Sequence, residues 1–325
     1  MPEQRKAMEK KLELLCIGTA IVDCIIKGFD PEPVSAVGYI AESCSLNPGG
    51  EGVNEAVTAS KLGLKAGILC FLGRDGAGEL LSDCLTANGV DMSAVVTEKD
   101  HASPVTTIFL NPDGTRRSIT NNAHRYNFQP ERFPDAIRSA EAVSICSLFR
   151  APFDRAETVN EVIRTAKEGG AVIYADTKLP NFGRLRPEDI TESLAMTDYI
   201  FPNEAEAKYY TGQTDPDKMA ETLLDFGVKN VIIKLGADGC LFRSRQERWR
   251  LGAYPVDAID TTGSGDNFIA GFIYAKKHLQ SNREALIYAN ACGAICATAL
   301  GTLAGIKDNG QVERFIREHE APFMD

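Results

Sequence analysis

Short apolar runs alternate with segments of helical periodicity along most of the chain. The runs are rich in β-branched residues and short, which is typical of buried strands. We predict strands within residues 12–26, 66–72, 142–148, 171–175, 198–201 and 230–235. We predict helices at residues 53–62, 78–87, 155–168, 205–210 and 218–226. Strands that alternate with helices indicate an α/β fold with a doubly wound, mainly parallel sheet flanked by helices.

Two segments interrupt this alternation. Residues 105–110 and 115–120 flank the sequence Asn-Pro-Asp-Gly at 111–114, whose residue types favour the turn of a β-hairpin. The segment that ends near residue 46 is also strand-like rather than helical. We expect these pieces, at about residues 26–46 and 104–121, to form a small β-sheet that projects from the main domain as a lid.

The last third of the chain, from Gly265 to Arg317, has a mostly helical pattern. Its near-continuous run of small apolar residues, ALIYANACGAICATALG, predicts a deeply buried helix. The sequence has no linker-like shift in composition, internal repeat or low-complexity tract. We therefore predict a single domain over residues 1–325 that carries the lid.

Composition narrows the class of protein. Hydrophobic residues make up 44% and charged residues 25%, as in soluble globular proteins. The formal net charge of −10 argues against a nucleic-acid partner, because such binding depends on Lys and Arg that neutralise phosphates. No apolar run approaches the ~20 residues that cross a bilayer, and the charged segment 1–11 lacks the apolar stretch of a signal peptide. We expect a cytoplasmic protein without a membrane partner.

The nine cysteines do not suggest a metal or disulfide framework. Their number is odd, and no C-x-x-C pair occurs. Cys292 and Cys296 are one helical turn apart, but no histidine or acidic cluster accompanies them. Reduced, mostly buried thiols are the favoured interpretation.

The clearest local chemistry lies in Asp260-Thr261-Thr262-Gly263-Ser264-Gly265-Asp266-Asn267, which is followed by a helical pattern. Small residues let a backbone approach a ligand closely. The first amides of a helix are unpaired and lie at the positive end of its dipole, so this segment predicts an anion site suited to a phosphoryl group. On spacing alone, Asp266 is either the N-cap of the helix or the group that accepts a hydroxyl proton during phosphoryl transfer.

Five motifs occur in an order that resembles the PfkB, or ribokinase-like, family of carbohydrate kinases, over nearly the whole chain. DTTGSGD resembles the C-terminal signature DTTGAGD, with Ser264 in place of alanine. NPGGEGVNEA, at 47–56, resembles the N-terminal signature, in which two glycines precede an asparagine that opens a helix. The other matches are GRDGAG at 73–78, the N-x-x-E motif at 203–206 and the nucleotide turn KLGADG at 234–239. The resemblance implies a ribokinase-like fold and an ATP-dependent sugar kinase.

The resemblance also implies roles for individual residues. Asp266 is expected to be the general base, and the amides of Gly263, Ser264 and Gly265 the anion hole. The expected substrate-binding residues are Asp23, Gly49, Gly50, Asn54 and Arg150. Asp23, which we place late in the first strand, has a second interpretation as a strand-end or turn residue. Function is favoured, because a carboxylate within the sequence IVDCII needs a partner.

By the same resemblance, the nucleotide is expected to lie against Asn203, Glu206, Lys234, Gly236, Gly239 and Asn290. Glu206 would act on Mg²⁺ through water, because Mg²⁺ keeps several waters and takes few protein carboxylates. Asn203 and Glu206 also match a helix capping box, and both roles can hold at once. Asp260 and Thr262 match positions that hold a monovalent cation, K⁺, in ribokinase-like relatives.

The sequence departs from ribokinase at positions that bear on the substrate. Ile21 stands where an asparagine helps bind the sugar, Glu51 replaces a lysine, and Lys234 replaces a threonine. Arg150 falls where ribokinase has an acidic substrate ligand, and a basic group there suits a carboxylate or phosphate on the substrate. Lys178 resembles a lysine of relatives that act on acidic or phosphorylated sugars. These departures argue against ribose and leave the sugar or sugar acid open.

Other interpretations stay open. A nucleoside kinase of the same fold would stack aromatic residues on the base, and Phe109 and Tyr39 are either such residues or part of the lid core. A non-catalytic sugar-binding regulator is disfavoured by the intact Asp266 and its glycines. His124 and Arg125 either close over the substrate or form an exposed polar turn. Because relatives often pair their lid sheets, we expect a homodimer through the lid.

Overall fold

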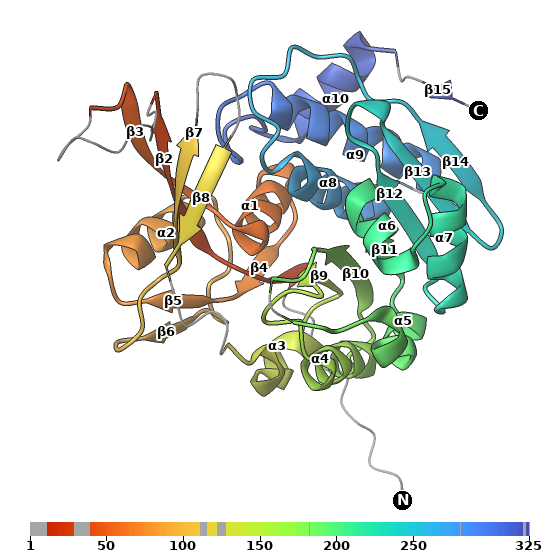
Figure 1. The fold of residues 1–325 in the computed structure, drawn as a ribbon, viewed down its shortest axis with the longest axis horizontal. Coiled ribbons are helices and arrows are strands. Elements are labelled where there is room, and N and C mark those ends of the chain that lie inside the picture. Colours follow the sequence, from red (N-terminus) through yellow and green to blue (C-terminus); the bar gives the residue numbers. More distant parts are fainter. Residues whose placement is uncertain are drawn as a thin grey trace, which may run out of the picture.

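The computed structural model describes residues 12–28, 40–110, 116–121, 128–181, 183–279, 281–320 and 323–324. Within these residues the chain forms a large sheet with helices on both faces, a smaller four-stranded sheet and a pair of short strands (Figure 1). His124, Arg125, Tyr39 and the predicted turn at 111–114 lie outside the described residues.

The large sheet has nine strands in the order β15-β14-β13-β12-β11-β10-β9-β1-β4. All neighbours from β4 to β12 are parallel, whereas β13, β14 and β15 continue the sheet with antiparallel pairing. The predicted doubly wound, mainly parallel sheet is therefore confirmed, with an antiparallel edge as an addition. The strands are β1 (Leu14–Ile17), β4 (Ala66–Leu69), β9 (Ala142–Leu148), β10 (Val172–Thr177), β11 (Tyr199–Phe201), β12 (Asn230–Lys234), β13 (Cys240–Ser244), β14 (Arg248–Leu251) and β15 (Phe323–Met324).

Hydrophobic clusters cover both faces of this sheet. Leu14 and Cys16 of β1 belong to the cluster that includes side chains of α1, α2, α8, α9 and α10, while Leu15 and Ile17 belong to the cluster with α3 to α7. Successive side chains of a strand point to opposite faces, so a continuous apolar run is what burial on both faces requires. The helices are α1 (Glu51–Leu62), α2 (Gly76–Ala87), α3 (Pro134–Arg138), α4 (Ala156–Glu168), α5 (Thr191–Met196), α6 (Glu204–Thr211), α7 (Pro216–Asp225), α8 (Ser264–His278), α9 (Asn282–Ala297) and α10 (Asn309–Glu318).

The small sheet has the order β3-β2-β7-β8 and lies beside α1 and α2 (Figure 1). The described ends of the predicted segment 26–46 belong to β2 and β3 of this sheet, and the segment 104–121 supplies its hairpin strands β7 and β8, which pair in antiparallel. Its strands are β2 (Ile21–Lys27), β3 (Ser43–Gly49), β7 (Val105–Leu110) and β8 (Arg116–Thr120).

Two predicted strands are each divided between sheets. The run at 12–26 becomes β1 of the large sheet and β2 of the small sheet, so the placement of Asp23 in the first strand is wrong: it lies in β2. The run at 66–72 likewise becomes β4 and β5 (Phe71–Gly73), which pairs with β6 (Val96–Glu98). An apolar run shows that a segment is buried, but not which sheet each half joins.

Two further expectations meet the structure here. All nine cysteines are free thiols and most are buried, as predicted. In the part of the chain that the structure describes, no helix combines the length and the apolar character needed to span a membrane.

Candidate active site

A cavity of about 850 Å³ lies at the carboxyl ends of the parallel strands. Arg150 follows β9, Lys178 follows β10, Asn203 follows β11 and Lys234 ends β12, and all four line the cavity. Open parallel sheets bind ligands at this edge. The rest of the wall comes from β2, the start of α1, the loop before α8 and the first turns of α8, and from α9.

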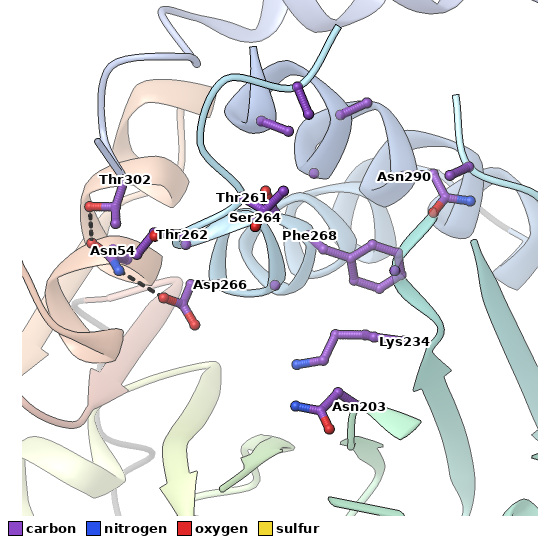
Figure 2. A pocket seen from close by; sticks show the side chains of 18 of the residues that line it. Asn54, Asn203, Lys234, Thr261, Thr262, Ser264, Asp266, Phe268, Asn290 and Thr302 are labelled. Atoms are coloured by element: carbon purple, nitrogen blue, oxygen red, sulfur yellow. Dashed lines mark hydrogen bonds between the residues drawn. The ribbon is translucent and has the colours of Figure 1, made fainter. Parts of the chain in front are cut away.

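Asp266 lies in the first turn of α8 and faces this cavity (Figure 2). The N-cap of the helix is Gly263, and no side chain caps it, so the interpretation of Asp266 as the N-cap is wrong. The Asp266 side chain is only 9% exposed. Asn54 Nδ2 donates to Asp266 Oδ2 at 2.7 Å, and Lys178 Nζ lies 3.6 Å from Asp266 Oδ1. Asn54 and Lys178 thus hold the Asp266 carboxylate from two sides at the N-terminus of α8.

The orientation of Asn54 is itself fixed. Thr302 Oγ1 donates to Asn54 Oδ1 at 2.7 Å, which leaves the amide nitrogen to face Asp266 (Figure 2). All three residues are buried. Thr302 lies in the loop between α9 and α10, a segment that the sequence analysis interpreted as helical. It was missed because its role depends on a contact with a residue 248 positions away.

The surroundings of Asp266 shift its proton affinity in both directions. Burial raises the pKa of Asp266, and the carboxylates of Asp176 and Glu51 raise it further. The Lys178 ammonium and the hydrogen bond from Asn54 lower it, and the net shift is upward. A carboxylate with a raised pKa is a stronger base, which suits a group that accepts a proton from a hydroxyl.

The turn before α8 brings its backbone close to the cavity. Gly263 has a φ of 77°, and a Cβ on it would lie 2.7 Å from Thr302 Cβ, so only glycine fits there. Gly263, Ser264 and Gly265 all line the cavity. The Ser264 N–H donates to Thr261 O at 3.2 Å, within the turn. The anion hole formed by the amides of these three residues stays a prediction. Of the three, the Ser264 amide already donates to Thr261 O.

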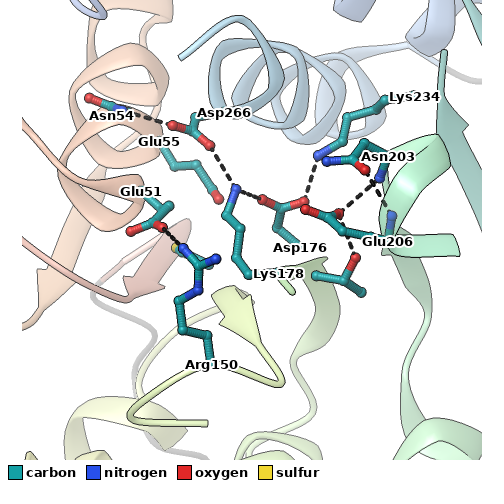
Figure 3. Close-up of polar contacts among 12 residues, drawn as sticks. Glu51, Asn54, Glu55, Arg150, Asp176, Lys178, Asn203, Glu206, Lys234 and Asp266 are labelled. Atoms are coloured by element: carbon teal, nitrogen blue, oxygen red, sulfur yellow. Dashed lines mark hydrogen bonds and ion pairs between the residues drawn. The ribbon is translucent and has the colours of Figure 1, made fainter. Parts of the chain in front are cut away.

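A buried ionic cluster crosses the floor of the cavity (Figure 3). Asp176 is fully buried, and its two oxygens lie 2.7 Å from Lys178 Nζ and 2.6 Å from Lys234 Nζ. Burial acts to raise the pKa of Asp176, but the two ammonium groups outweigh it and lower the pKa. Burial likewise acts to lower the pKa of Lys178, but nearby carboxylates, chiefly Asp176 and Asp266, raise it well above its ordinary value. Asp176 and Lys178 therefore form a buried ion pair that is charged at neutral pH.

Asn203 and Glu206 form the predicted capping box of α6. Asn203 Oδ1 accepts from the Glu206 N–H, and Glu206 Oε2 accepts from the Asn203 N–H, both at 2.9 Å. Glu206 Oε2 also accepts from the Thr177 hydroxyl at 2.8 Å, and burial raises the pKa of Glu206. Asn203 lines the cavity, whereas Glu206 lies behind it and is 5% exposed. A carboxylate in this position fits contact with Mg²⁺ through water better than direct ligation.

The substrate-binding predictions fall at the end of the cavity near the small sheet. Asp23, Gly50, Asn54 and Arg150 line it, and Gly49 lies behind Asp23, whose Oδ2 would be 2.9 Å from a Cβ on Gly49. The Arg150 guanidinium donates twice to Leu179 O, at 3.0 and 2.9 Å. It also lies 4.0 Å from Glu51 Oε1. Arg150 thus already has partners, one of them anionic.

The opposite end of the cavity holds the predicted nucleotide residues. Gly236, Gly239 and Asn290 line it together with Lys234. Asn290 Nδ2 donates to Gly252 O at 3.2 Å, so its amide also anchors the loop after β14. Thr262 lines the cavity, but Asp260 does not: its oxygens accept from the N–H groups of Thr262 and Gly301. A cation site at Asp260 and Thr262 stays a prediction.

Comparisons with known proteins show what this chain is similar to. The model of the pfkB family carbohydrate kinase matches residues 11–309. The chain is 30% identical to aminoimidazole riboside kinase of Salmonella typhimurium, over 84% of this chain and 88% of the relative. It is 27% identical to the Arabidopsis thaliana protein named "Probable fructokinase-7", over 92% of this chain and 91% of the relative. A solved E. coli structure that holds ATP and Mg²⁺ has a TM-score of 0.79 and 26% identity, and covers 95% of this chain and 100% of that chain.

Proposed function

Because the chain belongs to the PfkB family of carbohydrate kinases, we propose that it transfers the γ-phosphoryl group of ATP to a hydroxyl of a neutral sugar, with Asp266 as the general base. Membership of this family makes the chain a phosphotransferase. The observation that carries the proposal is the position of Asp266, which faces the cavity from the first turn of α8 between Asn54 and Lys178.

In the proposed reaction the acceptor oxygen forms a bond to the γ-phosphorus. The bond from that phosphorus to the oxygen bridging the β- and γ-phosphates breaks, and ADP leaves with its electron pair. The hydroxyl proton passes to Asp266, whose raised pKa supports this role. The positive end of the α8 dipole and the amides of Gly263 and Gly265 would lie against the transferring group, where phosphoryl transfer needs charge stabilisation.

The charges at the acceptor end favour a neutral substrate. In the described part of the cavity wall there, Arg150 faces Glu51, and Lys178 faces Asp176 and Asp266. An anionic substrate would have to displace one of these carboxylates, whereas sugar hydroxyls can donate to carboxylates and accept from amides. We propose that Asp23 and Asn54 bind such hydroxyls and that the turn at Gly49 and Gly50 lets the sugar approach the backbone. Arg150 would then hold Glu51 in place at this end of the cavity rather than bind an anionic group of the substrate.

The nucleotide would occupy the other end of the cavity. Gly236, Gly239 and Asn290 would contact the nucleoside, Asn203 the α- and β-phosphates, and Lys234 the γ-phosphate. Mg²⁺, held by Glu206 through water, would neutralise charge on the β- and γ-phosphates. Asp260 and Thr262 are proposed to hold a monovalent cation, K⁺, beside the loop that precedes α8.

We propose that the small sheet acts as a lid on a single domain over residues 1–325. Asp23 belongs to this sheet and lines the cavity, so movement of the sheet would carry a substrate-binding group. Among the described residues β3 and β8 are the edge strands of this sheet and each pairs with one neighbour, which supports a homodimer formed through the lids.

A riboside is the second candidate acceptor. Its support is the aminoimidazole riboside kinase, to which this chain is 30% identical. Phe109 does not support base stacking beside Asp23, because β2–β7 pairing places Thr106 opposite Asp23 and Phe109 three residues further along, on the other face of the sheet.

A coupled assay of ADP release with MgATP tests the proposal across pentoses, hexoses, sugar acids and nucleosides. We expect turnover with a neutral sugar, and a loss of about 10²–10⁴-fold in kcat for Asp266→Asn, because that substitution removes the base but keeps the size of the side chain. Turnover only with a nucleoside would select the second candidate. Unchanged kcat in Asp266→Asn would refute the role of Asp266, and no turnover with any acceptor would refute the proposed function.

A further inference from the structure

The buried cluster around Asp176 is not explained by a structural role alone. It places two ammonium groups, those of Lys178 and Lys234, on one fully buried carboxylate. Both lysines line the cavity, and both ammonium groups contact Asp176 (Figure 3). The two ammonium groups share this carboxylate, and Lys178 also faces Asp266. A lysine ammonium has three donors, so these partners leave donors available to a ligand.

Both ammonium groups lie beside the proposed reaction centre. Lys178 Nζ is 3.6 Å from Asp266 Oδ1. Lys234 Nζ would be 3.4 Å from a Cβ placed on Gly265, in the first turn of α8. The two cations therefore flank the helix N-terminus, one on the side of the base and one on the side of the predicted nucleotide turn. In the proposed reaction the phosphoryl group moves from the nucleotide to the acceptor beside Asp266, and both ammonium groups would lie near its path.

We propose that Lys178 and Lys234 are catalytic residues that contact the transferring phosphoryl group, and that Asp176 is the positioning residue that holds both. This inference rests on the proposed function. In the free enzyme Lys178 has two carboxylate neighbours, Asp176 and Asp266. When Asp266 accepts the hydroxyl proton, it becomes neutral, and Asp176 is then the only one of these two contacting carboxylates that still opposes the charge of Lys178.

This coupling makes the effect of Lys178 largest in the transition state. The charge of Lys178 becomes available to the phosphoryl oxygens at the step in which the acceptor proton leaves. Only an interaction that is stronger in the transition state than in the ground state accelerates the chemical step. Lys178 meets this condition without moving, and the tether to Asp176 means that little reorganisation is needed.

The test compares Lys178→Met, Lys234→Met and Asp176→Asn with wild type. Lys167→Met is the matched control, because Lys167 is also a partly buried lysine paired with an aspartate, Asp198, and it contacts Ala171 O at the opposite end of β10. Three quantities are measured with the best neutral acceptor: kcat, the Kd for MgADP, and the Kd for MgADP with tetrafluoroaluminate, which mimics the transferring group.

We expect kcat to fall by about 10²–10³-fold in Lys178→Met, as for loss of one preorganised charge-stabilising donor. Binding of MgADP with tetrafluoroaluminate should weaken in parallel, while binding of MgADP alone should stay within about threefold in Lys178→Met. Lys234→Met and Asp176→Asn should follow the same pattern, Lys178→Arg should recover part of the loss, and Lys167→Met should behave as wild type. If Lys178 served folding alone, its loss would not weaken binding of MgADP with tetrafluoroaluminate while leaving binding of MgADP unchanged.

Wild-type kcat in Lys178→Met and Lys234→Met would overturn the inference while leaving the proposed function intact. A parallel loss of MgADP affinity and of affinity for the complex would also overturn it, because that result indicates uniform binding. If Lys178→Met does not fold, Lys234→Met decides by the same criteria. A wild-type protein without turnover on any acceptor would instead refute the proposed function.

Discussion

Thr302→Val removes the hydroxyl that fixes Asn54 beside the proposed base. Thr302 Oγ1 and Asn54 Oδ1 are 2.7 Å apart, and Asn54 Nδ2 and Asp266 Oδ2 are also 2.7 Å apart. Valine has nearly the shape of threonine, so the substitution removes one hydrogen bond without opening a large cavity. Asn54 Oδ1 then loses the donor that the structure gives it, and the amide is free to turn its oxygen towards Asp266.

Two magnitudes follow from this loss. An unsatisfied buried acceptor costs about 1–3 kcal/mol of free energy of unfolding. The hydrogen bond from Asn54 lowers the pKa of Asp266, so losing it raises that pKa further. A hydrogen bond to a charged group contributes about 1.5–3 kcal/mol and a tenfold change in an equilibrium constant is about 1.36 kcal/mol, so we expect the pKa to rise by about one to two pH units. Because only ionised Asp266 is a base, the acid limb of kcat/KM should move to higher pH by that amount.

The assay is the pH dependence of kcat/KM for the best neutral acceptor, together with urea unfolding. Thr302→Ser is the matched control, since it keeps the hydroxyl and loses only the methyl group, and its acid limb should coincide with that of wild type. A Thr302→Val variant that loses stability as expected but keeps the acid limb of wild type would show that Thr302 has a structural role only.

Two further substitutions test the electrostatics around Asp266. Glu51→Gln removes a carboxylate that raises the pKa of Asp266, so the acid limb of kcat/KM should move to lower pH, opposite to Thr302→Val. The substitution also removes the anionic partner of Arg150, so kcat/KM for a sugar acid should rise relative to kcat/KM for a neutral sugar. An unchanged ratio of these two kcat/KM values would contradict the expectation. Glu55 is fully buried, accepts from Ser144 Oγ at 2.5 Å, and has its pKa raised to about 8 by burial and nearby carboxylates. The folded state thus keeps a proton on Glu55 that the unfolded state releases above pH 4.5. In urea unfolding, the stability of wild type should therefore fall by about 3 kcal/mol more than that of Glu55→Gln between about pH 5 and pH 7.5. If the stabilities of the two proteins depend on pH in the same way, the raised pKa of Glu55 is wrong.

The central fold could be predicted from apolar runs because strands buried on both faces leave a continuous signal. The run at 142–148 coincides with β9, and the runs for β10 and β12 differ from the strands by one or two residues. The antiparallel strands β13 and β14 gave no comparable signal. β14 reads Arg-Trp-Arg-Leu and only Leu251 of it is buried, because an antiparallel strand can leave one face to solvent.

The candidate site was partly predictable for a different reason. Gly263 to Asp266 and Asn54 lie in motifs, so their importance could be inferred without knowing their contacts. Asp176 carried a signal that went unused: it stands two residues before Lys178 at the end of a predicted strand, and side chains at that spacing point to the same face. Thr302 had no such neighbour in sequence, and only the folded chain brings it to Asn54.

The positions that depart from ribokinase show why charge at a site has to be assessed after folding. Taken singly, Arg150, Lys178 and Lys234 suggest a pocket for an anionic substrate. In the folded chain Arg150 faces Glu51, which is itself a departure, and the two lysines share Asp176. Such partners lie far apart in sequence, 58 positions in the case of Lys234 and Asp176, so no local pattern reveals the compensation. A substrate meets only the net charge that is left after these groups have paired. Around Asp266 this net charge changes during the proposed reaction, because the base becomes neutral and Lys178 stays charged.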